Sequence, residues 1–246
     1  MSGNFDIMQE MERDPALHSN RVIERPFPVP GEGLQRHVRS QLANDSTLRL
    51  VQQIFQRQGA PRVVVFAGID HGNGCSEVAA SVAETIAANA PRRVCLVEGN
   101  FRSPGLPSIM QTTSYPGLSD ALIEEGTIRS YLKPVCNENL WFLSAGPLTV
   151  DSPNLLSSER MKVRSAELRK EFDFVIYDAP PMTRYADAIA LGQLSDGIVL
   201  VLEAESTRRE AALIAVEHLR SSNVPILGAV LNKRKFPIPQ SIYKRL

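Results

Sequence analysis

The clearest signal along the chain is an alternation between short apolar runs and longer segments in which apolar residues recur at helical spacing. Most of the short runs are apolar throughout, as expected for strands covered by helices on both faces. The predicted strands are 62–66, 94–98, 140–143, 174–178, 197–203 and 226–231, and the predicted helices are 75–90, 117–125, 159–171, 185–194 and 207–221. This order predicts an α/β fold with a doubly wound, mainly parallel sheet flanked by helices.

The two ends of the chain do not share this pattern. Residues 26–33 contain three alternating prolines and two glycines, which favour an extended linker, and a short helix over 6–13 is a weaker prediction. Helical spacing begins near Ser46, with Leu48, Val51 and Ile54 on one face. We therefore predict a flexible extension and proline-rich linker over 1–45, a folded domain over 46–232 and a basic tail over 233–246.

Composition narrows the classes of function. Lys plus Arg equals Asp plus Glu at 27 each among 246 residues, so no overall charge indicates nucleic acid as a partner. The three cysteines form no C-x-x-C pair, no run approaches the ~20 apolar residues of a membrane span, and the N-terminus lacks a signal-peptide layout. We expect a soluble cytoplasmic protein, whose basic tail is either solvated or docks on an anionic surface.

One segment carries the strongest candidate chemistry. Residues 66–77 place Gly72-Asn73-Gly74-Cys75-Ser76-Glu77 between a predicted strand and a predicted helix, the context of a phosphate-binding loop. The loop pattern requires lysine where this chain has Cys75. We predict these six residues as a nucleotide-binding loop; the alternative is a turn that needs glycine for positive φ and binds nothing.

Polar residues also follow the other predicted strands. Glu98 and Asn100 follow the second strand, Asp178 ends the strand over 174–178, and Asn232 follows the last one. In a parallel sheet these carboxyl ends lie side by side, and ligands bind just outside them.

Together these motifs resemble the bacterial tyrosine kinase (BY-kinase) branch of the MinD/ParA-type P-loop ATPases, over about 170 residues from 63 to 232. The matching segments are Gly72-Asn-Gly-Cys-Ser76, Val97-Glu-Gly-Asn-Phe-Arg-Ser-Pro104, Pro116-Gly-Leu-Ser-Asp-Ala-Leu122, Asn139-Leu-Trp-Phe-Leu-Ser-Ala-Gly146, Leu155-Leu-Ser-Ser158, Phe172-Asp-Phe-Val-Ile-Tyr-Asp-Ala-Pro-Pro181 and the Asp187 and Asp196-Gly197 pair.

The resemblance implies a site for ATP or ADP with Mg²⁺. It assigns Ser76, Asp178 and Glu98 to the metal, Glu98 also to the catalytic base of an active enzyme, Asn232 to adenine and Tyr243 to phosphate acceptance. The alternatives from the residues alone are a strand-end cap for Asp178, a turn residue for Asn232 and an exposed tyrosine in a basic tail for Tyr243.

The resemblance also implies a role in capsule and exopolysaccharide assembly. The partner would be the cytoplasmic segment of an inner-membrane polysaccharide chain-length regulator or export protein, which would hold the chain peripherally at the inner membrane. Homo-oligomers are implied as well, although the predicted helix over 46–57 lacks the expected Glu-x-x-Arg-x-x-Arg pattern.

The departures from the family pattern are concerted. Cys75 replaces the lysine, Glu77 replaces a threonine, Glu98 and Asn100 replace two aspartates, and Tyr243 is alone where a tyrosine cluster is expected. We therefore predict a degenerate, non-catalytic or weakly nucleotide-binding regulator or scaffold. The alternative is an active tyrosine autokinase or ATPase with a relocated cation, for which Arg62 and Arg102 are the nearby choices.

Cys75 itself suggests a third chemistry. A thiol at a helix N-terminus can have a lowered pKa and act as a nucleophile. A cysteine-dependent phosphatase would need arginine six positions later, where this chain has Ser81, and Glu77 disfavours a thiolate. We expect no thiol chemistry here.

Overall fold

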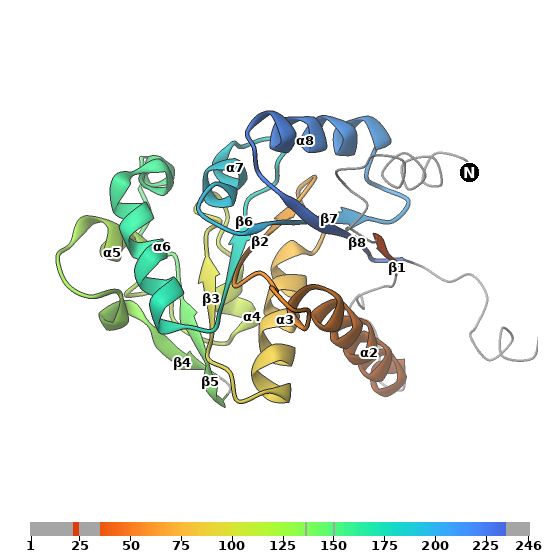
Figure 1. Cartoon of the computed structure of the whole chain (residues 1–246), viewed down its shortest axis with the longest axis horizontal. Coiled ribbons are helices and arrows are strands. Elements are labelled where there is room, and N and C mark those ends of the chain that lie inside the picture. The colour runs from red at the N-terminus through yellow and green to blue at the C-terminus, as the bar shows by residue number, and fades with distance from the viewer. Residues whose placement is uncertain (1–21, 25–34, 136, 150, 235–246) are drawn as a thin grey trace, which may run out of the picture.

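An eight-stranded sheet forms the centre of the computed structural model, which describes residues 22–24, 35–135, 137–149 and 151–234 (Figure 1). The strands are β1 (Val22–Glu24), β2 (Val63–Gly68), β3 (Val94–Glu98), β4 (Lys133–Val135), β5 (Asn137–Leu143), β6 (Phe174–Ala179), β7 (Gly197–Glu203) and β8 (Ile226–Asn232). Their spatial order is β1-β8-β7-β2-β6-β3-β5-β4, and all pairs are parallel except β4 with β5.

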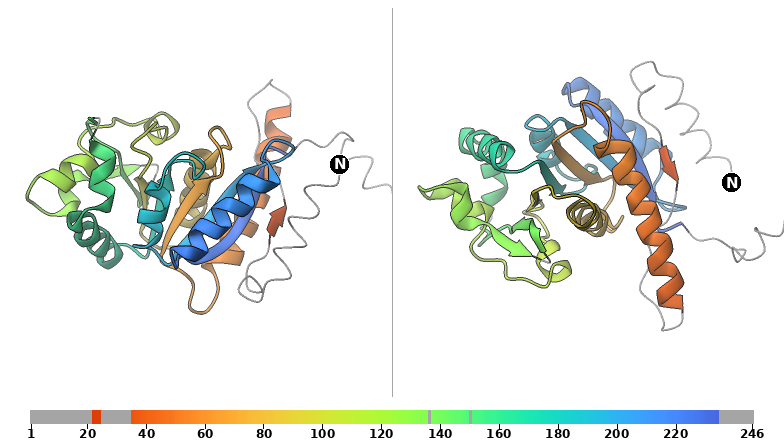
Figure 2. Two further views of the ribbon diagram at one scale, coloured as in Figure 1. Left: turned by 90° about the horizontal axis from the view of Figure 1, so that it is seen from above. Right: turned by 60° about the horizontal axis from the view of Figure 1, so that its bottom comes forward.

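Helices cover both faces of this sheet. They are α2 (Gln35–Phe55), α3 (Cys75–Asn89), α4 (Leu106–Ile109), α5 (Leu118–Ile123), α6 (Glu159–Glu171), α7 (Asp187–Gly192) and α8 (Arg209–Ser221), with 3₁₀ turns η2 (Ile128–Tyr131) and η3 (Ser152–Ser157). In Figure 1, α7 and α8 lie above the sheet, and α2 and α3 lie below it. The first turns of α2 project beyond the body of the domain in both views of Figure 2.

The central strand β2 shows how sequence builds these layers. Val63, Val65 and Ala67 face one apolar core, which includes residues of α5 to α8, whereas Val64 and Phe66 face the other, which includes residues of α2 and α3. All of these side chains are completely buried. A strand with both faces buried is apolar at every position, which confirms the predicted doubly wound architecture.

The six predicted strands and five predicted helices are all present, with ends shifted by a few residues. The predicted start of the first helix is wrong, because α2 begins at Gln35 rather than near Ser46. Residues 35–45 include strong helix formers such as Gln, Arg, Leu and Ala, so helical propensity extends the helix beyond its regularly spaced apolar positions. The helix thus crosses the proposed boundary at residue 45, which stays a prediction.

Two short strands were not predicted. Lys133–Val135 pairs antiparallel with β5, and Val22–Glu24 pairs with β8 within the predicted extension. Three residues are too few to show a periodicity, so neighbouring strands rather than local sequence define them. The predicted helix over 6–13, the linker, Tyr243 and residues 235–246 of the tail lie outside the described residues.

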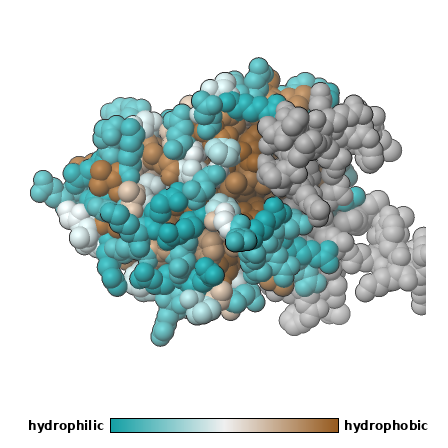
Figure 3. Space-filling model, in the orientation of Figure 1, coloured by the Kyte–Doolittle hydropathy of each residue, from teal (hydrophilic) through white to brown (hydrophobic). Residues whose placement is uncertain are grey.

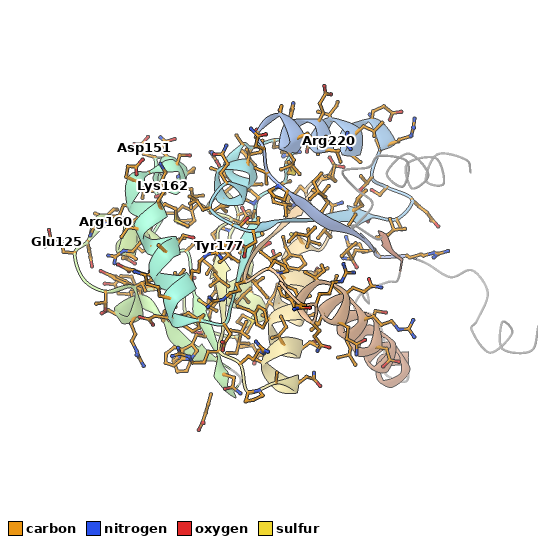
Figure 4. The ribbon with its side chains drawn as sticks, viewed as in Figure 1. Glu125, Asp151, Arg160, Lys162, Tyr177 and Arg220 are labelled. Carbon is orange, nitrogen blue, oxygen red and sulfur yellow. The ribbon has the colours of Figure 1, made fainter. Side chains whose placement is uncertain are left out.

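The surface is consistent with this layered core. On the face shown in Figure 3, apolar side chains gather in the middle, between the helical layers, and hydrophilic residues surround them. Figure 4 labels Arg160 and Lys162 on α6, where Lys162 is exposed, and Tyr177 in β6, which is completely buried. Within the described ranges, no helix has the length and apolar character needed to cross a bilayer.

Candidate nucleotide-binding site

The loop between β2 and α3 has the backbone of a phosphate cradle. Gly72 and Gly74 have φ of 86° and 78°, in the left-handed region that side-chain-bearing residues rarely adopt. In the described part of the chain, none of the backbone N–H groups of 71–77 donates to a protein acceptor. These groups lie at the positive end of the α3 dipole, so the loop presents an anion site made of backbone alone.

Polar side chains hold the loop in this shape from its outer side. Asn73 is buried; its Oδ1 accepts from the N–H of Asp70 at 2.6 Å, and its Nδ2 donates to Thr207 Oγ1 at 3.2 Å. Asn232, at the end of β8, donates from Nδ2 to the carbonyl oxygen of Asn73 at 2.8 Å. The amide of Asn232 therefore clamps the loop, and its predicted contact with adenine stays a prediction.

A lysine that was assigned to the tail also reaches the loop. The Lys233 Nζ donates to the carbonyl oxygen of Gly72 and lies 3.3 Å from a carboxylate oxygen of Glu203. Its charge is therefore paired with an acid on the outer side of the loop. Lys233 does not occupy the place of the missing lysine.

Two carboxyl groups meet below the loop, because Glu98 and Asp178 are paired positions at the ends of adjacent strands. Both are completely buried. Burial, followed by the charge of Asp178, raises the pKa of Glu98 to about 8. Burial also raises the pKa of Asp178 to about 6, although hydrogen bonds from Ser76 and Cys75 oppose that rise. The pair is a costly arrangement without a cation, because charged carboxylates are poorly solvated there.

Asp178 has the features of a metal-binding acid. Ser76 Oγ donates to Asp178 Oδ2 at 2.5 Å, and Asp178 Oδ1 has no hydrogen-bond partner among the described residues. An unpartnered buried carboxylate oxygen beside a hydroxyl fits Mg²⁺, which prefers oxygen ligands and retains waters. Ser76 and Asp178 would hold the ion, which would shield phosphate charge. In the described ranges, no three or more His, Cys, Asp or Glu side chains form a cluster that could hold a metal ion.

Glu98 is less suited to the metal in this conformation. Its Oε2 accepts from the N–H groups of Gly105 and Leu106 at 2.9 and 2.8 Å, and its Oε1 accepts from Asn100 N at 3.3 Å. These contacts fix the loop that precedes α4. The predicted metal and base roles of Glu98 stay predictions.

Cys75 occupies the first position of α3, where the family pattern has lysine. Burial, and then the nearby charge of Asp178, raise the pKa of the Cys75 thiol well above its ordinary value. The thiol therefore stays protonated at neutral pH, and the absence of thiol chemistry stays a prediction.

A cavity of about 530 Å³ opens beside the loop. Its lining includes His71, Gly74, Ser76, Glu77, Asn100, Arg102, Arg184 and Tyr185. Arg102 is bound through Nε and a terminal nitrogen to the carboxylate of Asp187, at 2.9 and 3.3 Å, and stacks on Tyr185. Arg184 is exposed and has no acidic partner within the described ranges.

Arg184 was missed by sequence reasoning, because only the course of the loop after β6 brings it to the cavity. The nomination of Arg62 as a relocated cation is wrong. Arg62 precedes β2, at the opposite end of this strand from the loop, and its guanidinium donates to the carbonyl oxygens of Arg169, Phe172 and Asp173. One β-strand of six residues, roughly 20 Å, separates it from the loop.

Several known proteins are similar to this chain in sequence. The tyrosine-protein kinase YwqD of Bacillus subtilis is 32% identical over 164 residues, which cover 67% of this chain and 69% of that protein. The putative tyrosine-protein kinase CapB of Staphylococcus aureus is 30% identical over 171 residues, or 70% of this chain and 75% of that protein. The succinoglycan biosynthesis transport protein ExoP of Rhizobium meliloti is 32% identical over 177 residues, 70% of this chain but 22% of that protein. No family model matches the sequence.

Solved structures support the same assignment of fold. The chimerical protein CapA2B2 superposes with a TM-score of 0.79 at 21% identity, covering 93% of this chain and 100% of that one. The septum site-determining protein MinD of Pyrococcus horikoshii, complexed with Mg-ADP, gives 0.60 at 19% identity over 74% of this chain and 76% of that one. The fold is therefore MinD/ParA-like, and the chain belongs to the bacterial tyrosine kinase family of P-loop ATPases.

Proposed function

We propose that this chain is a degenerate bacterial tyrosine kinase, which binds nucleotide weakly or not at all and acts as a regulator or scaffold. The observation that carries the proposal is Cys75 at the position of the phosphate-binding lysine, with its thiol beside Asp178. A neutral thiol cannot replace the charge of an ammonium group. The remaining cradle is backbone only.

The electrostatic loss is large on the scale of this chemistry. Phosphoryl transfer depends almost entirely on positioning and on stabilising charge at the phosphates. Removing one well-placed donor from a comparable site costs about 3–4 kcal/mol, or ~10²–10³ in rate. Asp70 and Glu77 add negative charge to the same loop, and Lys233 is paired with Glu203 on its outer side.

The cellular role is inferred from relatives. CapB and ExoP match most of this chain, and the name of ExoP refers to the biosynthesis and transport of a polysaccharide, succinoglycan. We infer a role in exopolysaccharide biosynthesis and export. The partner would be the cytoplasmic segment of an inner-membrane chain-length regulator or export protein, an idea supported by a matching chimera whose name joins CapA to CapB. The chain would then be cytoplasmic and peripheral at the inner membrane, with homo-oligomers a further prediction.

A second candidate function rests on Arg184. This exposed arginine lines the cavity without an acidic partner in the described ranges, so it is the best-placed cation for an active autokinase or ATPase. Glu98 would then be the base, and Tyr243 a phosphate acceptor. If the second function holds, Arg184→Ala abolishes an ATP turnover that the unchanged protein shows.

Complementation in the native host tests the regulatory role. Deletion of the gene should change the amount or chain length of exported polysaccharide, and Asp178→Asn, which keeps the size of the side chain, should restore it as fully as the unchanged gene. A deletion without effect refutes the role in polysaccharide assembly. Failure of Asp178→Asn at normal protein levels refutes the claim that the role is non-catalytic.

A further inference from the structure

A second cavity, of about 610 Å³, lies at the amino ends of the central strands, opposite the phosphate loop at their carboxyl ends. Its lining comes from the end of α2, the turn over 56–60, the end of α3 and the residues that precede β2, β3 and β6. We call it the basic pocket, because its charged lining residues are Arg57, Arg62, Arg92 and Asp173. Three positive charges face one negative charge.

The floor of the basic pocket is apolar and aromatic. Phe55 and Phe174 meet edge to face, with ring centroids 5.4 Å apart, and Val51 and Ile86 lie beside them. Arg92 extends over the Phe174 ring, with its guanidinium carbon 5.6 Å from the centroid. The pocket therefore combines cationic walls with an apolar base, which suits a peptide that carries both acidic and apolar side chains.

Two of these arginines, Arg62 and Arg92, have no acidic partner in the described ranges. The Arg62 guanidinium is held by three carbonyl oxygens, which fix its position but do not cancel its charge. The Asp173 carboxylate accepts from the backbone N–H of Arg93 at 2.8 Å. Arg92 is exposed, and no acidic group pairs with it in the described ranges.

The chain itself contains a complementary segment. Residues 4–12 carry Asp6, Glu10 and Glu12 and no basic residue, and they include the apolar side chains of Phe5, Ile7, Met8 and Met11. We propose that this N-terminal acidic segment docks in the basic pocket of the same molecule. This inference does not rest on the proposed function.

The geometry of β1 makes the connection feasible. Val22 pairs with Ala229, which through Leu200 is level with Ala67 near the end of β2. From Val22, the basic pocket is then roughly 17 Å away along the strands, five residues back from Ala67, and about 14 Å away across the three strand spacings from β1 to β2. The straight path from Val22 to the pocket is about 22 Å. Residues 13–21 can span up to about 30 Å, so the acidic segment reaches the pocket from β1.

Hydrogen exchange of the full chain, read by mass spectrometry, tests the proposal. We expect amides of residues 4–12 to exchange at least about tenfold more slowly than in the same free peptide, and Arg92→Glu to abolish the protection. The matched control is Arg93→Glu, because Arg93 is also exposed and also lies over an aromatic ring, that of Phe172, but does not line the pocket. In the reciprocal test, Asp6→Asn with Glu10→Gln and Glu12→Gln should speed exchange at 57–60.

Each outcome decides the matter. Protection that Arg92→Glu removes and Arg93→Glu leaves, with the reciprocal effect at 57–60, supports docking. Unprotected amides over 4–12, or equal effects of the two arginine variants, overturn it. Protection that disappears on dilution assigns the segment to a second copy and overturns docking within one molecule.

Discussion

Restoring the lysine at position 75 should restore ligand binding, because the loop backbone and Ser76 are intact. Gly72 and Gly74 keep their left-handed conformations, and Ser76 keeps its contact with Asp178. In Cys75→Lys, the new ammonium group would start from the first turn of α3, next to an anion cradle and a buried carboxyl. We expect it to interact with both phosphate and Asp178.

The expected size follows from the lost donor. A contribution of about 3–4 kcal/mol corresponds to a change of ~10²–10³ in affinity. At a Mg-ATP concentration near 100 times the new Kd, ligand stabilises the folded state by about 2.7 kcal/mol. For a domain of this size, that shifts Tm by about 5–10 °C. The unchanged protein should shift by less than about 2 °C at the same concentration.

Thermal melts with and without Mg-ATP measure this difference. Each variant is compared with itself, so an effect of lysine on stability cancels. Cys75→Met is the matched control, since it lengthens the side chain without adding charge and should give no shift. An equal shift for the unchanged protein and Cys75→Lys would refute the claim that the missing lysine limits binding.

Three further variants test the local structure by denaturant unfolding. Because the folded pKa of Glu98 is about 8 against an ordinary 4.5, the folded state binds more protons than the unfolded state between these values, and stability falls as pH rises. Glu98→Gln should remove that fall, on the order of 5 kcal/mol across the window, and an unchanged slope would contradict the buried charge. Gly74→Ala should lower the free energy of unfolding by about 1–3 kcal/mol more than Gly72→Ala does. The new Cβ at position 74 would lie 2.4 Å from Asn232 Nδ2, whereas the Cβ at position 72 meets open space. Equal losses would show that Asn232 moves aside without cost. Asn232→Ala should cost about 1–3 kcal/mol by leaving the Asn73 carbonyl without its partner, and no loss would mean that the clamp does not stabilise the loop.

The fold was predictable because the strands are buried on both faces. The run before the loop, Val63 to Phe66, is apolar at every position, and the helix that follows is rich in small apolar residues. Such patterns depend on local sequence, which is why α6 was placed with both ends correct. The start of α2 was misplaced because its early turns extend the helix without regularly spaced apolar residues.

The site was only partly predictable for a different reason. The loop glycines, Ser76 and Asp178 follow strands in sequence, so the parallel topology brings them together. The roles of Arg184 and Lys233 depend on where loops run after β6 and β8. Arg62 was misjudged because it is close to the loop in sequence but lies at the opposite end of β2. Residue identity also could not show that the backbone N–H groups of Gly105 and Leu106 occupy the Glu98 carboxylate.

The most direct test of the degenerate assignment is phosphoryl transfer by the purified full chain. The protein is incubated with Mg²⁺ and ATP labelled at the γ-phosphate, and released phosphate and phosphotyrosine are measured beside Asp178→Asn. We predict that both proteins give the same background. ATP turnover or tyrosine labelling that requires Asp178 would contradict the account and identify an active kinase or ATPase.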